Sequence, residues 1–389
     1  MDQLYIIKIS GPDHTGITAG LMERVAAHDG KLLDIGQSIT HGLLSLSFLI
    51  QTNSEKEDEL LKDLLFKAKQ LEITLDYQKV ENKKEVQVSG DKYILSCVCL
   101  QGITPDFLSK IAATLAKYNI NIQRIDRTTK NLDSLDIYTI AQSEEVSWDV
   151  VKKELIAISN SFNTDMALLK DNVWRRNKRL IVFDMDSTLI QSEVIVEMAK
   201  VHGVGEKVHE ITERAMNGEL DFDQSLIERV KLLKGLDENK LQGILENINY
   251  TSGVQKFIQT VQKLGYKTAI ISGGFTYFAN SFKDDLGINY MFANELEVSD
   301  GKLTGRVKGQ IVNAEKKALI LEMIAQQENI NLAQVVAIGD GANDLPMLAK
   351  AGLGIAFHAK EIVKQNAQQN MSHGPMTSIL YFLGLSEEV

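Results

Sequence analysis

The sequence predicts an α/β protein in which two small α+β units precede a larger doubly wound parallel sheet. Three observations support this prediction. A βαββαβ order of elements occurs near the start and returns roughly 90 residues later, as expected of an internal repeat. After residue 180, short apolar strands alternate with helices, which is typical of a parallel sheet. Three of those strands end in polar loops, two of them rich in Asp and the third in Gly.

The composition supports a globular protein and excludes several functional classes. A chain of 389 residues with 44% hydrophobic residues can form two or three domains with sizeable cores. The net charge of −10 argues against a general nucleic-acid binder. The best apolar run, Leu43 to Ile50, is far too short to span a membrane, and Met1-Asp2 lacks the basic start of a signal peptide. We therefore expect a cytoplasmic protein with neither a membrane nor a nucleic-acid partner.

The first copy of the repeat is expected over residues 1–80. A helix should begin at Ile17, where apolar residues recur at helical spacing, and a second should cover Glu57 to Lys69. A turn cluster, Gly11-Pro12-Asp13-His14-Thr15-Gly16, joins the first strand to the first helix. Alternating or apolar runs predict four strands, which are Leu4–Ser10, Leu32–Ser38, Leu43–Gln51 and Leu71–Tyr77.

The second copy is expected over residues 90–170, after a charged linker at Glu81 to Asp91. Its helices should begin near Phe107 and cover Ser147 to Ser159. Cys97 and Cys99 lie two apart on a predicted strand and face the same way, so we expect two buried free thiols in a reducing compartment. The predicted strands are Tyr93–Leu100, Ile120–Arg127, Leu135–Ala141 and Asp165–Leu169.

This repeat resembles a tandem pair of ACT domains, through its strand order and the Gly-Pro-Asp-x-x-Gly loop at residues 11–16. The resemblance implies modules that bind amino acids and pair edge to edge, and hence a homodimer. Gly11, Asp13 and Gly16 form the candidate ligand loop, whose backbone N–H groups could bind a carboxylate such as that of serine. The second copy lacks the closing Gly. The alternative, that both copies serve only as dimerisation surfaces, stays open.

A basic run, Arg175 to Arg179, leads into the last domain, which is expected over residues 178–389. We interpret the run as a solvated hinge or an interdomain contact. Four buried strands of a parallel sheet are then predicted at Leu180–Phe183, Thr268–Ile271, Val335–Ile338 and Leu353–Phe357.

Two acids, Asp184 and Asp186, follow the first of these strands directly. Ligands bind at the carboxyl ends of strands in open α/β sheets. Two carboxylates this close repel each other, so they need a cation or a shared proton. The commoner alternative for an isolated Asp-x-Asp is a turn with two solvated side chains. The polar loops after the next strands argue against that alternative.

If the first three strands are neighbours, their loops place several acids and phosphate-binding groups at one site. Carboxylates in excess suit Mg²⁺, whereas a Ser hydroxyl, a Gly N–H and a Lys ammonium suit phosphate oxygens. A carboxylate beside the metal could attack phosphorus, and a second could protonate the leaving oxygen. The pattern therefore predicts a phosphatase with an aspartyl-phosphate intermediate. The converging residues are Asp184, Asp186, Ser272, Asp340, Asn343 and Asp344, with Lys317 on the helix before the third strand.

The ordered signature Asp-x-Asp-x-Thr, Ser-Gly-Gly, Lys and Gly-Asp-x-x-x-Asp resembles the haloacid dehalogenase-like superfamily. The resemblance implies that Asp184 is the nucleophile and a Mg²⁺ ligand, with Asp340 as a further ligand. It implies that Asp186 is the general acid and then base, its backbone carbonyl also ligating Mg²⁺. Asp344 would steady the ligands or Lys317. The residues holding the phosphoryl oxygens would be Ser272, Gly273, Lys317 and Asn343.

Residues 193–250 approximately, between the first and second strands, are helical by periodicity and predict a cap over the site. The residues Phe-Asp-Met-Asp-Ser-Thr at 183–188, Glu193, Ile270–Gly274 and Ile338–Asp344 resemble superfamily members that act on O-phospho-L-serine in serine biosynthesis. This resemblance places Arg229 on the substrate carboxylate and Glu193 on the ammonium group, with Phe222 shielding the pocket. From helix position alone, Arg229 would instead pair on the surface with an acid such as Glu228 or Asp223.

Two rival functions remain open from the sequence. The first is a related phosphatase or phosphotransferase that acts on another phosphorylated metabolite, because the sheet motifs serve many substrates. The second is an amino-acid sensor whose catalytic half is vestigial. The intact acids at 184, 186, 340 and 344 argue against the sensor.

Overall fold

The computed structural model describes residues 2–81, 90–130, 133–143, 146–216 and 219–385. It divides into two compact units, Met1–Gln87 and Val88–Val389. The α/β fold class, with an α+β N-terminal part and a large mixed sheet with parallel strands, is confirmed. The linker expected at Glu81 to Asp91 lies mostly outside the described residues.

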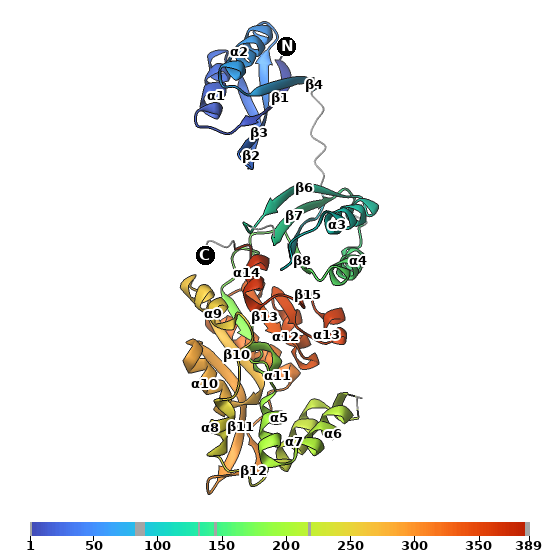
Figure 1. The fold of residues 1–389 in the computed structure, drawn as a ribbon, viewed down its shortest axis with the longest axis vertical. Helices are drawn as coiled ribbons and strands as arrows, with labels where there is room; N and C mark the ends of the chain where they lie inside the picture. The colour runs from blue at the N-terminus through green and yellow to red at the C-terminus, as the bar shows by residue number, and fades with distance from the viewer. Residues whose placement is uncertain (1, 82–89, 131–132, 144–145, 217–218, 386–389) are drawn as a thin grey trace. The chain divides into compact units, whose positions relative to one another are not determined.

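The first unit is an antiparallel sheet with two helices packed on one face (Figure 1). Its strand order is β2-β3-β1-β4. Alternate residues of β3, from Leu44 to Ile50, are buried against the helices. The last strand begins three residues later than expected, because Leu71 caps α2 and Glu72 takes a left-handed turn. The elements are β1 (Asp2–Pro12), α1 (Ile17–Ala27), β2 (Lys31–Thr40), β3 (Leu43–Asn53), α2 (Glu57–Gln70) and β4 (Thr74–Val80).

The same order of elements opens the second unit. Its first helix begins where the side chain of Thr104 accepts a hydrogen bond from the N–H of Phe107 and Pro105 occupies the first turn. Cys97 and Cys99 are buried and free, as predicted. The elements are β5 (Lys92–Val98), α3 (Pro105–Lys117), β6 (Ile120–Arg127), β7 (Ser134–Ala141), α4 (Trp148–Ser161) and β8 (Asp165–Lys170).

A sheet of 11 strands runs through this unit, in the order β12-β11-β10-β9-β13-β14-β15-β8-β5-β7-β6. The first three strands predicted after residue 180 are neighbours, as expected, because β9 pairs in parallel with both β10 and β13. The strands not yet given are β9 (Leu180–Phe183), β10 (Lys267–Phe275), β11 (Tyr290–Ser299), β12 (Lys302–Lys308), β13 (Val335–Gly339), β14 (Leu353–Phe357) and β15 (Gln369–Met371).

Helices cover both faces of the parallel strands (Figure 1). This burial on both sides explains why β9 is apolar at every position. One layer holds α9 (Val254–Lys263), α10 (Thr276–Leu286) and α14 (Ile379–Phe382). The other holds α11 (Ala314–Gln327), α12 (Leu345–Lys350) and α13 (Glu361–Asn366).

The insertion after β9 is helical, as expected of a cap. Its two connections to the sheet run side by side, because Ile190 pairs with Tyr250. The hairpin β11–β12, which the sequence analysis missed, packs against α7. The cap helices are α5 (Val194–His202), α6 (Gly205–Met216), α7 (Phe222–Leu232) and α8 (Lys240–Leu245).

The basic run before β9 makes a contact inside the second unit and is not solvated throughout. Arg175 is 5% exposed and donates hydrogen bonds to Asp136 Oδ2 at 2.7 Å and Ser96 Oγ at 3.0 Å. Arg175 therefore contacts the second repeat, whereas Arg176 and Arg179 of the same run are exposed. Among the described helices, none has the length and apolar character needed to cross a membrane.

Candidate active site

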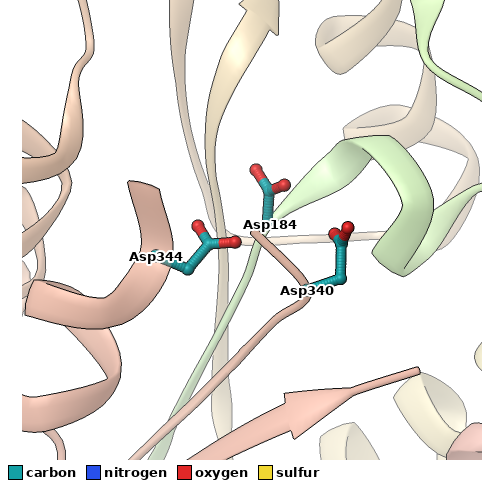
Figure 2. A group of neighbouring side chains, drawn as sticks. All are labelled: Asp184, Asp340 and Asp344. Carbon is teal, nitrogen blue, oxygen red and sulfur yellow. The ribbon is translucent and has the colours of Figure 1, made fainter. Parts of the chain in front are cut away.

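Three carboxylates meet where β9 and β13 end. Asp184 extends β9 by donating its N–H to the carbonyl of Ile338 at 2.9 Å. Figure 2 shows the carboxyl groups of Asp184 and Asp340 directed to the same side, with that of Asp344 approaching from a short helix, η3 (Ala342–Asp344). Ligand oxygens of the three lie within 4.8 Å of one another. Asp184 is only 6% exposed, so the solvated-turn alternative is wrong.

Lys317 lies beneath these acids and links two of them. Its buried ammonium group donates to Asp184 Oδ1 at 2.6 Å and to Asp344 Oδ1 at 2.7 Å. Asp344 Oδ2 accepts the N–H of Gly341 at 3.0 Å. Burial opposes the charge on Lys317, but the two carboxylates outweigh it and raise the lysine pKa. Both oxygens of Asp344 thus accept hydrogen bonds within the protein, whereas Lys317 contacts Oδ1 of Asp184 and Thr188 contacts Oδ1 of Asp340.

The acids carry more negative charge than Lys317 can balance. Burial, and then repulsion from neighbouring carboxylates, raises the pKa values of Asp184 and Asp340. Burial, followed by repulsion from Asp184, raises the pKa of Asp186 to about 8. A divalent cation would relieve this repulsion, and oxygen ligands of this type suit one. The residues present therefore fit a divalent metal.

The loop after Asp184 turns sharply and places Asp186 beside the first cap helix. Ser187 adopts a left-handed φ of 56°, and Asp186 Oδ1 accepts the N–H of Val194 at 2.9 Å. Thr188 is fully buried and donates its hydroxyl to Asp340 Oδ1 at 2.9 Å. Thr188 is the Thr of the Asp-x-Asp-x-Thr signature, and this spacing is the sequence signal for its place in the site.

The loop at the end of β10 is compact, and the cap lies against it. The Oγ atom of Ser272 accepts the N–H of Gly274 at 2.9 Å. A Cβ on Gly273 would lie 2.7 Å from Phe222 Cζ, and one on Gly274 would lie 2.7 Å from Asp186 Oδ2. A side chain at Gly273 would therefore have to displace Phe222, and one at Gly274 would have to displace Met185 and the Asp186 carboxylate. Phe222, on α7, closes over the loop that the sequence predicted to hold a phosphoryl group.

Arg229, two turns along α7 from Phe222, is 9% exposed. Its Nε donates to the carbonyl of Ser225 at 3.3 Å. Burial lowers the pKa of its guanidinium, while the negative charges of Glu193 and Asp186 oppose that shift. The alternative surface pair does not form, since Glu228 binds Arg214 and Asp223 accepts from Asn313. Asn343 is half-buried, and its side chain lies against Gly341 in the loop after β13.

Two polar residues near the site carry no motif signal. Asn294, on β11, donates to the carbonyl of Gly273 and accepts from Val312. Asp223, beside Phe222, accepts a hydrogen bond at 3.2 Å from Asn313, which caps α11. Periodicity could not locate either residue, because their partners lie on other elements.

The candidate ligand loop of the first unit joins β1 to α1. Gly11 is in β1, and the N–H of Asp13 donates to the carbonyl of Gly42 at 2.8 Å. Gly16 has a φ of 95° at the start of α1, a conformation that favours glycine. Gly11, Asp13 and Gly16 thus lie in one loop between β1 and α1. Binding of serine by this loop remains a prediction.

Known proteins resemble the chain over nearly its whole length. Models of the ACT domain and of the haloacid dehalogenase-like hydrolases match residues 3–78 and 178–352. A phosphoserine phosphatase of Streptomyces coelicolor is 36% identical, over 98% of this chain and 92% of its own. The phosphoserine phosphatase SerB2 of Mycobacterium tuberculosis is 33% identical, over 98% and 93%. A crystal structure of a probable phosphoserine phosphatase from Vibrio cholerae, 36% identical, covers 78% of this chain and 89% of its own with a TM-score of 0.61.

Proposed function

The chain belongs to the phosphoserine phosphatase family, and from that membership we propose that it hydrolyses O-phospho-L-serine to L-serine and inorganic phosphate. This reaction would be the last step of L-serine biosynthesis by the phosphorylated route. The single observation that carries the proposal is the cluster of Asp184, Asp340 and Asp344 around the buried Lys317. That cluster unites a nucleophile, a cation site and a phosphate-binding ammonium.

We assign the metal as Mg²⁺, held by Asp184, by Asp340 and by the backbone carbonyl of Asp186. When bound, it would neutralise charge that builds up on the phosphoryl oxygens. Asp344 does not bind it directly in this scheme, because Lys317 and the N–H of Gly341 engage its oxygens. Asp344 instead orients Lys317, and Thr188 orients Asp340.

The protein side chains divide the chemistry between them. Asp184 attacks phosphorus and forms an aspartyl phosphate as the serine oxygen leaves. Burial raises the pKa of Asp186, which favours the protonated form that a general acid needs, and Asp186 donates this proton to the serine oxygen. The resulting carboxylate then takes a proton from the water that hydrolyses the intermediate. Ser272, Gly273, Lys317 and Asn343 bind the phosphoryl oxygens throughout.

The cap selects the amino-acid part of the substrate. Arg229 would bind the carboxylate and Glu193 the ammonium group, and the negative charge of Glu193 already acts on the largely buried guanidinium of Arg229. Phe222 packs over Gly273 and shields the reacting bonds from water. We further propose a cytoplasmic homodimer whose Gly11–Gly16 loop senses serine.

Replacement of the nucleophile tests the covalent route. We expect Asp184→Asn to abolish phosphoserine hydrolysis in the presence of Mg²⁺, by at least about 10³-fold in kcat, because the amide cannot form the intermediate. Phosphate release is the measurement, and Asp284→Asn, at an exposed position on α10, is the control. Substantial turnover by the Asp184 variant would refute the aspartyl-phosphate mechanism.

A further inference from the structure

Asn294 lies at the centre of a buried hydrogen-bond chain that no motif predicts. It stands on β11 opposite Phe275 of β10 and is 1% exposed. Its Nδ2 donates to the carbonyl oxygen of Gly273 at 2.8 Å, and its Oδ1 accepts the N–H of Val312 at 2.9 Å. One amide group thus joins the loop after β10 to the segment that leads into α11.

The first branch of this chain reaches the hydroxyl group of Ser272. The carbonyl held by Asn294 belongs to the Gly273–Gly274 peptide, whose N–H donates to Ser272 Oγ at 2.9 Å. Both ends of this peptide are therefore fixed. Because Oγ accepts at that side, its own hydrogen is left to point away from the peptide. Hydrogen bonds linked in this way also polarise one another.

The second branch reaches Lys317. Asn313 follows Val312 and caps α11 by accepting the N–H of Lys316 at 3.1 Å. The helix so started carries Lys317, whose ammonium group contacts Asp184 and Asp344. A shift of Val312 would therefore displace the start of the helix that positions this lysine.

We propose that Asn294 is a positioning residue. It holds the Ser272 hydroxyl and the Lys317 ammonium where both can bind the same phosphoryl group. The inference rests on the proposed phosphatase function and adds a residue to it. Asn294 does not touch the substrate in this scheme. Its effect should fall on recognition of the phosphoryl group and not on recognition of the amino acid.

Asn294→Asp is the sharpest test, because it keeps the size of the side chain and the acceptor for Val312. It replaces the donor with a carboxylate oxygen that repels the carbonyl of Gly273, so the Gly273–Gly274 peptide must turn. Loss of a buried hydrogen bond of this kind predicts a fall in kcat/KM of roughly tenfold or more. The fall should be equal for phosphoserine and for p-nitrophenyl phosphate. The inhibition constant of inorganic phosphate should rise by a similar factor.

The inhibition constant of inorganic phosphate distinguishes a positioning role of Asn294 from a loss of folded protein. A variant that only lowers the folded fraction loses apparent kcat but keeps the same inhibition constant, and thermal melting of the full-length chain reports that fraction. Asn294→Ala provides a second variant with no repulsive group. Asn289→Ala is the matched control, since Asn289 accepts the N–H of Thr268 at 2.9 Å near the opposite end of β10. It should leave all constants within about threefold.

An unchanged inhibition constant for phosphate in both Asn294 variants would overturn the inference. If the wild-type chain hydrolyses neither ester, the proposed function fails by itself. Calorimetric binding of inorganic phosphate with Mg²⁺, compared between wild type and Asn294→Asp, then still decides the role of Asn294.

Discussion

Lys178 is a buried ammonium group without an acidic partner among the described residues. Its Nζ donates to the carbonyl of Ala333 at 2.6 Å, and burial lowers its pKa from 10.5 to about 8. Between pH 8 and 10.5 the unfolded chain therefore binds more protons at this residue than the folded chain does. The free energy of unfolding should rise with pH across that window as the buried charge is lost.

Replacement by Met removes this titration. The stability of Lys178→Met minus that of wild type should be most favourable near pH 7 and should decline by about 3 kcal/mol towards pH 10.5. Urea unfolding at several pH values measures the difference. Lys267→Met is the control, because that side chain is 44% exposed and its loss removes no buried charge. A pH-independent difference at Lys178 would show that its ammonium is well solvated.

The cap helix α7 carries the residues that should decide specificity. We expect Arg229→Ala to lower kcat/KM for phosphoserine by roughly 10- to 100-fold, because a charge-assisted pair with the substrate carboxylate is lost. Hydrolysis of p-nitrophenyl phosphate, which lacks that carboxylate, should change by less than about threefold. Arg214→Ala, at a side chain 46% exposed on the same cap, should affect neither substrate. Equal losses of kcat/KM on both esters would instead indicate that Arg229 has a structural role. The assignment of phosphoserine as the substrate would then lose its support from Arg229.

Elements with a local hydrophobic pattern could be predicted from the sequence. Elements and residues whose role depends on contacts with distant parts of the chain could not. The strand Leu180–Phe183 has the predicted bounds, because four apolar residues directly before Asp184 define it. The strand β11 was missed because Asn294, Glu295 and Glu297 interrupt its apolar pattern. Its hairpin did leave a signal, since Asp300 and Gly301 both adopt positive φ in the turn to β12. The role of Asn294 could not be predicted from the sequence, because it depends on hydrogen bonds to Gly273 and Val312, which lie on other segments.

At the scale of the whole molecule, the second repeat is continuous with the catalytic sheet. Asp165, at the start of β8, is 3% exposed. Its carboxylate accepts backbone N–H groups of Ser372 at 2.5 Å, His373 at 3.1 Å and Gly374 at 2.7 Å, in the loop after β15. Ala167 and Leu169 of β8 share a core with the catalytic strands. The second repeat also buries a core beneath its own two helices, and the first unit buries a further core of its own.

Two compact units predict two thermal transitions, and Asp165 should affect only one of them. Asp165→Asn replaces an acceptor oxygen with an NH₂ group that faces N–H donors, so three backbone N–H groups, of which that of Gly374 is buried, compete for one oxygen. The cost should be on the order of 3 kcal/mol, which lowers the transition of residues 88–389 by on the order of 5 °C. Ile50→Ala, in the core of the first unit, should lower the other transition instead. If calorimetry showed that both transition temperatures fall together in either variant, the two units would not unfold independently. The 11-stranded sheet would then not be confined to a cooperative unit of its own.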